Sequence, residues 1–234
     1  MIILKYTLYR FFISFLAFLI FYSYQSNAEF FRDISNILPD RNPRLSYGVG
    51  VSDFNQDGKY EFIVTGFKYP NLALSFEEGK LKNIINGPLF NDPNSSTIGI
   101  AACDMDGDGH EELYFLNTDT YSGKKKYSDR LLKYKNSKII DLFENNADPG
   151  ELNFTAGRSV VCVDRLGEGK YATYVANYGG PTRFYEFQEN KIKDIAPFLN
   201  IDRVTGGRAV VAGHIISNNM DIFATNERDA NFLY

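Results

Sequence analysis

The chain has 234 residues, of which 44% are hydrophobic and 23% are charged. This is enough apolar material for a packed core in one domain or two small ones, so the composition excludes a disordered chain. The net charge of −4 and the lack of a long basic block exclude nucleic acid as a partner. Phe and Tyr bring the aromatic share to 15%, which favours β-structure.

Residues 1–28 have the pattern of a secretory signal peptide. Lys5 and Arg10 precede an apolar run at residues 11–24, and small residues follow at positions 26 and 28. The run is shorter than the ~20 residues that cross a bilayer, so we expect cleavage rather than a membrane anchor. Cleavage removes two basic residues and takes the net charge to −6. We expect a secreted or extracellular protein, periplasmic in a bacterial source, that is not an integral membrane protein.

The remaining residues, 29–234, contain an internal repeat. A short phrase centred on Asp33, Asn83, Asp141 and Asp194 recurs at spacings of 50, 58 and 53 residues. Such a period indicates a repeat architecture. It divides the chain at about 29–85, 86–143, 144–196 and an incomplete 197–234.

Each repeat shows the same order of short apolar runs. The first run begins at a glycine or next to one and ends at an acidic loop; a second run follows that loop, and a third alternates apolar and polar residues. The repeated phrase then closes the unit as a fourth strand. In chain order, the predicted strands are 48–52, 61–65, 71–76, 82–84; 98–103, 112–116, 130–134, 140–142; 157–163, 172–176, 182–187, 193–195; 206–213, 221–225 and 231–234.

Four-stranded repeats of roughly 40–50 residues are typical of a β-propeller, whose blades pack face to face around a central channel. A β-sandwich, the alternative all-β fold, does not require the same strand order to recur four times. We therefore predict an all-β fold, a β-propeller with blades of four antiparallel strands.

The loop between the first and second strands of a repeat carries the candidate chemistry. In two repeats it places oxygen side chains at positions 1, 3, 5 and 9, with glycine at position 6. Converging carboxylates repel one another unless a hard cation lies between them, and oxygen ligands select calcium. The backbone carbonyl of position 7 would complete the shell. The candidate calcium ligands are Asp53, Asn55, Asp57, Lys59 and Glu61 in the first loop, and Asp104, Asp106, Asp108, His110 and Glu112 in the second.

An EF-hand and an acidic turn without metal are the other interpretations of these loops. An EF-hand needs Glu at position 12 and flanking helices, whereas position 12 is Val64 or Phe115 within predicted strands. An acidic turn without metal remains open. The later loops, at 164–172 and 213–221, lack most ligands, so we expect no metal there. With four carboxylates against three, the second loop is expected to bind calcium more tightly than the first.

Two arginines, a run of lysines and two cysteines lie outside these loops. Arg158 and Arg208 occupy the same point in successive repeats, where they either contact an acidic ligand at the channel mouth or pair with a carboxylate of a neighbouring blade. The run at 124–126, three lysines, is expected to be a solvated turn. Cys103 and Cys162 are expected to be unbridged, because strand alternation points them to opposite faces of equivalent strands.

Six phrases of the sequence stand in an order that is specific to one family: 47–49, 66–72, 102–109, 114–118, 156–164 and 205–208. On these phrases, residues 30–234 resemble the N-terminal part of the cartilage acidic protein family, secreted proteins with FG-GAP/VCBS-type repeats. The resemblance implies a calcium-binding propeller like the integrin α-subunit head, used for extracellular binding. It also implies a ring of about seven blades, so that this chain is part of a longer protein or an open arc. Residues 30–34 have the phase of a fourth strand, which leaves closure of a four-bladed ring as the alternative.

Two functions follow as hypotheses. The first is a secreted, non-catalytic, calcium-binding module for adhesion or scaffolding, with an extracellular protein or glycan as its partner. The second is an extracellular enzyme with its active site at the channel mouth. Only His110 and His214 are present and no Gly-x-Ser-x-Gly motif occurs, so the sequence favours the first and predicts no enzyme.

Overall fold

The computed structural model describes residues 31–234, and the predicted signal peptide lies outside them. The chain divides into two compact units between Ile37 and Leu38. In the described part of the first unit, the Ser35 N–H donates to the Asp33 carboxylate at 2.8 Å and a short 3-10 helix, η1 (Ser35–Ile37), follows. This local side-chain bond favours a turn, and residues 31–34 form no strand. The fourth strand expected at 30–34 is thus wrong for its described residues.

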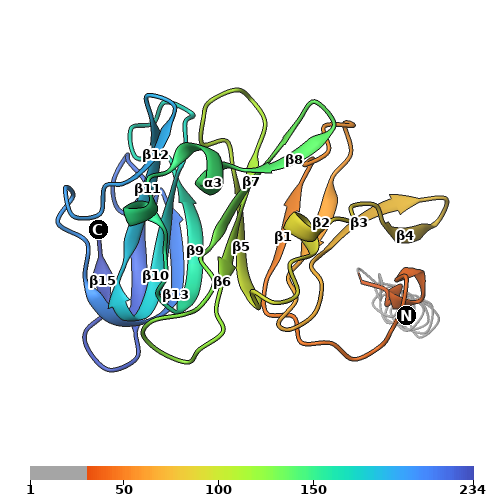
Figure 1. The fold of residues 1–234 in the computed structure, drawn as a ribbon, viewed down its shortest axis with the longest axis horizontal. Helices are drawn as coiled ribbons and strands as arrows, with labels where there is room; N and C mark the ends of the chain where they lie inside the picture. Colours follow the sequence, from red (N-terminus) through yellow and green to blue (C-terminus); the bar gives the residue numbers. More distant parts are fainter. Residues whose placement is uncertain (1–30) are drawn as a thin grey trace, which may run out of the picture. The chain divides into compact units, whose positions relative to one another are not determined.

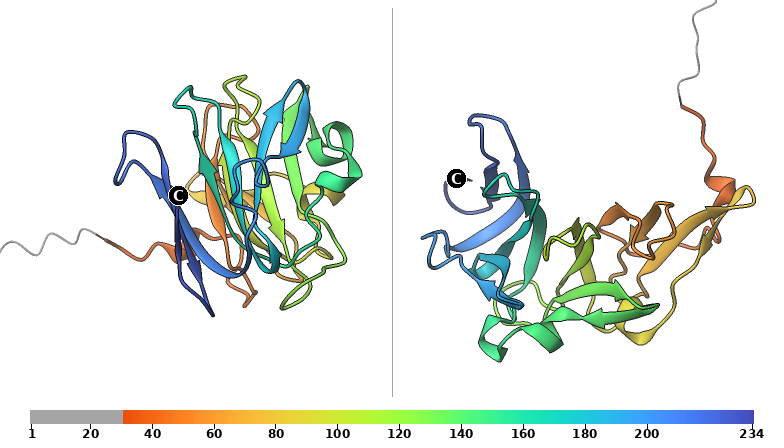
Figure 2. Two further views of the ribbon diagram at one scale, coloured as in Figure 1. Left: turned by 90° about the vertical axis from the view of Figure 1, so that its left-hand side faces the viewer. Right: turned by 90° about the horizontal axis from the view of Figure 1, so that it is seen from above.

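The second unit, residues 38–234, contains antiparallel strands in the predicted order (Figure 1). Seen from above in Figure 2, the sheets follow one another in chain order, from the orange first repeat to the blue fourth. The first two repeats are four-stranded meanders, and their predicted strands are confirmed. Their strands are β1 (Val49–Ser52), β2 (Glu61–Val64), β3 (Leu72–Glu77), β4 (Lys80–Asn83), β5 (Thr97–Cys103), β6 (Glu112–Asn117), β7 (Arg130–Lys135) and β8 (Lys138–Asp141).

The third and fourth repeats share one seven-stranded sheet. The reason is the length of β10, whose first part pairs with β9 and β11 while its end pairs with β13; that second pairing contains a register shift between Tyr178 and Gly180. The fourth repeat has three strands within the described residues, as expected. The strands are β9 (Gly157–Val163), β10 (Ala172–Pro181), β11 (Arg183–Gln188), β12 (Lys191–Asp194), β13 (Val204–Gly213), β14 (Asp221–Asn226) and β15 (Phe232–Leu233).

The phrase that marks the repeat has a structural cause. Its central side chain ends the fourth strand and accepts a hydrogen bond from a backbone N–H of the third strand. The pairs are Asn83 with Ala73 at 3.0 Å, Asp141 with Leu131 at 3.3 Å, and Asp194 with Phe184 at 3.0 Å. In the second and third repeats an arginine on the third strand also pairs with the aspartate, Arg130 at 2.9 Å and Arg183 at 2.6 Å. The phrase therefore recurs because it fastens the outer pair of strands.

Short helical turns connect the repeats. Asp141 also starts α3 (Leu142–Asn146), since its carboxylate accepts the Phe143 N–H at 3.0 Å. The other turns in the second unit are α2 (Pro88–Asn91) and η2 (Pro149–Glu151). Side-chain acceptors of this kind satisfy N–H groups that have no partner inside the helix.

The core lies between successive sheets, and β6 illustrates how. All of its residues, Glu112–Asn117, are buried. Leu113 and Phe115 pack with the apolar side chains of the first repeat, whereas Tyr114 and Leu116 pack with those of the third. Successive side chains of a strand point to opposite faces, so one strand serves two cores. This explains why its apolar run is continuous rather than alternating.

The outer faces of the first and fourth repeats expose apolar side chains. Ile63 of β2 is buried, but its neighbour Phe62 is 49% exposed, and Phe76 of β3 is 59% exposed. In the fourth repeat Ile222 is buried while Phe223 and Leu233 are 38% and 53% exposed. Exposed apolar patches of this kind mark contact surfaces.

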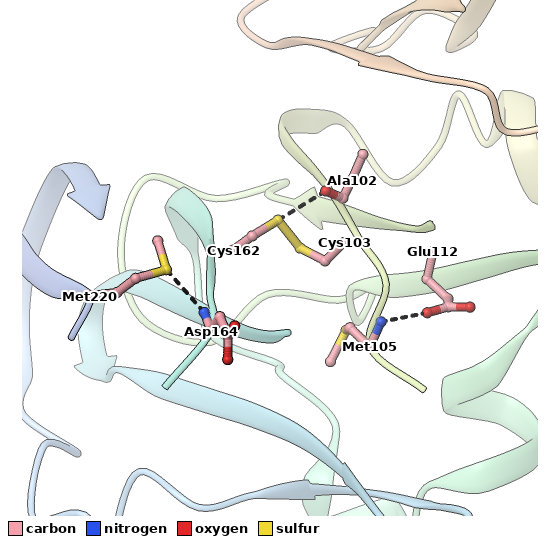
Figure 3. The surroundings of a disulfide bond; sticks show 7 residues. All are labelled: Ala102, Cys103, Met105, Glu112, Cys162, Asp164 and Met220. Atoms are coloured by element: carbon pink, nitrogen blue, oxygen red, sulfur yellow. Dashed lines mark hydrogen bonds between the residues drawn. A yellow bond between two sulfur atoms is a disulfide. The ribbon is translucent and has the colours of Figure 1, made fainter. Parts of the chain in front are cut away.

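Cys103 and Cys162 form a disulfide, which corrects the sequence expectation (Figure 3). Their Cα atoms are 5.8 Å apart, in the last residue of β5 and near the end of β9. The cysteines do point to opposite faces of equivalent strands, as predicted. Because successive sheets pack face to face, however, the facing sides of neighbouring sheets are opposite faces of equivalent strands. The alternation that seemed to separate the two thiols is what brings them together.

The lysine run at 124–126 is not a solvated turn throughout. Lys125 is buried, pairs with the buried carboxylate of Asp129 and donates to the Asn117 carbonyl oxygen at 2.8 Å. Asp129 also accepts hydrogen bonds from the Tyr114 hydroxyl at 2.7 Å and from Asn153 at 2.6 Å. Burial lowers the pKa of Lys125, and the Asp129 carboxylate opposes that effect. A buried lysine is tolerated because its charge is paired and hydrogen-bonded.

Candidate functional site

Three loops join the first strand of a repeat to the second and share one frame. The aspartate at position 1 accepts loop N–H groups: Gly58 donates to Asp53 at 3.0 Å, Gly109 to Asp104 at 2.9 Å and Gly169 to Asp164 at 2.8 Å. These glycines, at position 6, have φ of 85°, 88° and 77°. Side chains other than glycine disfavour that region, so the loops need glycine there. This frame is also present in the third loop, which keeps a carboxylate at position 5, Glu168, but has Leu166 and Ala172 at positions 3 and 9.

The second loop gathers its acidic side chains. Asp104, Asp106 and Asp108 each place a carboxylate oxygen within 4.8 Å of the others, and no other trio of acidic, histidine or cysteine side chains within residues 31–234 does so. Glu112, at position 9, is fully buried and accepts the Met105 N–H at 2.8 Å (Figure 3). The structure therefore brings the predicted ligands of this loop together.

A side chain that the sequence analysis did not consider lies among these carboxylates. The Lys133 ammonium, on β7, is 2.7 Å from Asp106, 2.8 Å from Asp108 and 2.7 Å from Glu112. Burial would lower the pKa of Lys133, but these hydrogen bonds outweigh burial and raise it, so the ammonium keeps its charge. Burial raises the pKa of Glu112, and Lys133 opposes that rise. The carboxylates thus already share a cation supplied by the chain.

The first loop has no such cation. Glu61, at its position 9, is fully buried and pairs with no cation in the described chain; the Phe54 N–H and the Ser75 hydroxyl act to lower its pKa, but neither makes a well-aligned hydrogen bond to its carboxylate oxygens. Burial, with the charges of Asp57 and Asp53, raises the pKa of Glu61 to about 7. An unpaired buried carboxylate is costly. Oxygen ligands beside an uncompensated carboxylate suit a hard divalent cation.

The difference between the two loops comes from one position on the third strand. Leu74 of β3 lies opposite Phe62, as Leu132 of β7 lies opposite Leu113. The next residue is Ser75 in the first repeat and Lys133 in the second. Comparing the third strands of the repeats would have revealed this exchange, because both predicted runs contain the residue concerned.

The position-7 residues contribute only their backbone. The side chains of Lys59 and His110 are exposed. Their N–H groups donate to the carboxylates at position 5, to Asp57 at 2.9 Å and to Asp108 at 3.1 Å. Their carbonyl oxygens remain the candidate ligands.

The third and fourth loops satisfy their carboxylates by other means. In the third, Arg165 pairs with Glu186 at 2.7 Å, and Glu186 occupies the strand position of Ser75 and Lys133. In the fourth, three loop N–H groups donate to Asp221. These hydrogen bonds lower the pKa of Asp221 to about 2, and the one from the Ile216 N–H contributes most. That neither loop binds metal stays a prediction.

Arg158 and Arg208 lie together, as their repeat positions suggested. Their guanidinium groups lie over the Tyr178 ring at 5.2 and 4.9 Å and over the Tyr121 ring at 5.2 and 5.7 Å. Arg208 pairs with Glu227 of its own repeat, not with a neighbouring one. Both arginines line a cavity of about 770 Å³. The two tyrosines, from a long loop and from β10, were not anticipated.

Part of the first two repeats matches a known repeat family. A family described as FG-GAP-like repeat matches residues 53–115, which contain both candidate calcium loops. A solved structure described as BBS1N in complex with ARL6DN, soaked with lead, aligns with 87% of this chain and 64% of that chain at a TM-score of 0.37 and 12% identity. A similarity that low does not by itself define the fold.

Two relatives match most of this chain. Cartilage acidic protein 1 of Xenopus tropicalis is 40% identical over 221 residues, which is 83% of this chain and 34% of that protein. Cartilage acidic protein 1 of Homo sapiens is 38% identical over 230 residues, 86% of this chain and 35% of the relative. The resemblance to this family is therefore confirmed. The chain spans about a third of the length of these relatives.

Proposed function

We propose that this chain is part of a secreted, non-catalytic β-propeller that binds calcium and serves as an extracellular binding, adhesion or scaffold module. Its partner is an extracellular protein or glycan. The FG-GAP-like repeat and the cartilage acidic proteins it resembles support an extracellular role. Among residues 31–234, no helix has both the length and the apolar character needed to cross a membrane.

The stacked sheets support the propeller. Each repeat buries one or both faces against its neighbours, and the two outermost faces are apolar and uncovered, at Phe62 and Phe76 and at Phe223 and Leu233. A ring of about seven blades would cover both faces with further repeats. Light scattering tests this, because a chain with two such faces should associate, whereas a compact, monodisperse monomer would contradict it.

The single observation that supports calcium binding most is the buried carboxylate of Glu61, which pairs with no cation within residues 31–234. Asp53, Asn55 and Asp57 and the Lys59 carbonyl would hold the ion with it. A divalent cation would neutralise Glu61 and remove its repulsion with Asp53 and Asp57, which raise its pKa. The residues of the first loop therefore have the donor chemistry for calcium, although the carboxylates of Asp53, Asp57 and Glu61 do not lie within 4.8 Å of one another as the three aspartates of the second loop do.

At the second loop calcium has to compete with Lys133. The ammonium already pairs with Asp106, Asp108 and Glu112, although one buried oxygen of Asp106 has no partner within residues 31–234. We therefore propose that the first loop binds calcium more tightly. This reverses the order expected from the number of carboxylates.

Calorimetric titration of calcium into the chelator-treated chain tests the proposal. We expect one tight site, lost in Asp57→Ala and in Glu61→Gln but kept in the matched variants Asp106→Ala and Glu112→Gln. Asp164→Ala, in the third loop, serves as the control that should leave calcium binding unchanged. Zero sites, or an unaltered stoichiometry in both Asp57→Ala and Asp106→Ala, would show that these loops are metal-free turns.

The non-catalytic part of the proposal has its own test. A screen of the purified chain against hydrolase and glycosidase substrates should give no turnover above that of a buffer control. Turnover that is lost in Arg158→Gln would instead support an enzyme at the cavity.

A further inference from the structure

The cavity beside Arg158 and Arg208 differs from the calcium loops in charge and lining. Tyr47 and Phe67, with rings 5.7 Å apart, line it together with Ile98 and Tyr121. Its volume of about 770 Å³ lies in the usual range of ligand sites, which combine apolar walls with few polar groups. The cavity therefore has the size and lining of a binding site.

The two arginines are held in place before any ligand arrives. Arg158 donates to the carbonyl oxygens of Gly157, at 2.7 Å, and of Tyr121. Arg208 donates to the Tyr121 hydroxyl at 2.9 Å. The guanidinium groups share the Tyr121 and Tyr178 rings. Contacts to aromatic faces attract cations and restrict their rotation.

The charges around the cavity do not balance. Arg208 pairs with Glu227, but Arg158 has no acidic partner within 4.0 Å among residues 31–234. The buried Nε of Arg158 also lacks an acceptor there. Asp119 lines the cavity and accepts the Lys126 N–H, and Arg228 lies 5.9 Å from the Tyr178 ring. The charged residues of the lining are thus two guanidinium groups, Arg158 and Arg208, and one carboxylate, Asp119, which leaves one positive charge in the lining itself.

We propose that Arg158 and Arg208 bind one carboxylate side chain of a partner protein segment, whose adjacent apolar residues pack against Tyr47 and Phe67. Guanidinium forks match a planar carboxylate. One unbalanced positive charge suits one carboxylate rather than a polyanion, which needs a row of basic residues. The apolar walls suit side chains next to the acidic one. This goes beyond calcium binding and does not require it.

Short blocked peptides provide the probe. Acetyl-Leu-Asp-Leu-amide is titrated into the full chain, expressed for secretion, while the backbone amide signals of residues 158–159 and 208–209 are followed by NMR. We expect saturable shifts at these residues, with at least about tenfold weaker binding of acetyl-Leu-Asn-Leu-amide, since only the charge and one acceptor differ. The shifts should be the same with calcium and with chelator, so that failure of calcium binding does not affect this test.

Variants separate recognition from folding. Arg158→Gln should weaken binding of the Asp peptide by about tenfold or more, and Arg158→Lys should recover only part of the loss. Arg165→Gln, an arginine in the third loop away from the cavity, is the matched control and should leave binding unchanged. Circular dichroism confirms that each variant folds.

Several outcomes would overturn the inference. They are equal binding of the Asn and Asp peptides, unchanged binding in a folded Arg158→Gln variant, and no binding of the Asp peptide at millimolar concentration. Tighter binding of heparin than of the peptide, lost in Arg158→Gln, would assign the cavity to a polyanionic glycan instead.

Discussion

The first and second loops carry nearly the same sequence motif but differ in what surrounds it. In the first, Glu61 is buried without a cationic partner and faces a strand that bears Ser75. In the second, Glu112 contacts the Lys133 ammonium at 2.7 Å, and the residue before the loop, Cys103, is held by a disulfide. The side chain across the sheet therefore decides how a loop of carboxylates is neutralised. The motif alone does not.

The largest effect should come from the disulfide, which lies beside the second loop and not beside the first. Replacing both cysteines, Cys103→Ser with Cys162→Ser, opens a covalent loop with a sequence separation of 59 residues. Chain entropy then predicts a loss of about 4 kcal/mol in the free energy of unfolding. Urea denaturation measures the loss, with calcium titration as the control. If calcium stoichiometry changed as well, the disulfide rather than Lys133 would set the difference between the loops.

The next effect should come from removing the internal cation. Lys133→Ser gives the second loop the residue of the first and leaves Asp106, Asp108 and Glu112 without their partner. We expect a loss of about 3 kcal/mol in calcium-free buffer, and most of it should return with calcium as a second binding site appears. Urea denaturation in chelator and in calcium measures both. Full stability in chelator would mean that the ammonium does not hold this loop.

The reciprocal change, Ser75→Lys, should have a smaller effect. A lysine there can pair with Glu61, so the calcium site of the first loop should be lost while the calcium-free protein becomes more stable. If that site has a dissociation constant of about 0.1–1 mM, losing it removes about 0.4–1.4 kcal/mol of stabilisation at 1 mM calcium. Thermal unfolding with and without calcium reports the change. Retained calcium binding would contradict the role given to this position.

The most gradual effect is a pH dependence that belongs to the first loop alone. The pKa of Glu61 rises from 4.5 to about 7 on folding, so between these values the folded chain binds the proton more tightly than the unfolded chain. The contribution of Glu61 to stability is therefore greatest below about pH 4.5 and falls as the pH rises to about 7. Urea midpoints of the calcium-free protein, compared with Glu61→Gln, isolate this slope. Equal slopes in the two proteins would contradict it.

The repeat and its strands could be predicted because they rest on local patterns. The phrase around Asp141 and Asp194 recurs since its side chain fastens two adjacent strands, and the loop glycines recur since the turn requires positive φ. Such features act within a few residues or one hairpin. Sequence spacing is sufficient to reveal them.

The features that the sequence did not predict depend on contacts between secondary-structure elements. The disulfide joins facing sides of two sheets, and alternation within a single strand does not describe how sheets face each other. Lys125 is buried because Asp129 and the Asn117 carbonyl receive it, which a run of three lysines does not indicate. Lys133 reaches the second loop from a strand 21 residues after Glu112. Lys133 lies outside the loop motif, so the motif does not predict its contacts.

The disulfide also changes what a cut in the backbone would do. It encloses residues 104–161, a stretch that includes the exposed side chain of Tyr121, 60% accessible, and the loop around Gly123. A protease that cleaves there produces two polypeptides that stay covalently joined beside the second loop. The nicked protein would migrate as one species until a reductant separates it. In an oxidising extracellular setting, the disulfide would keep the two pieces together after the backbone is cut.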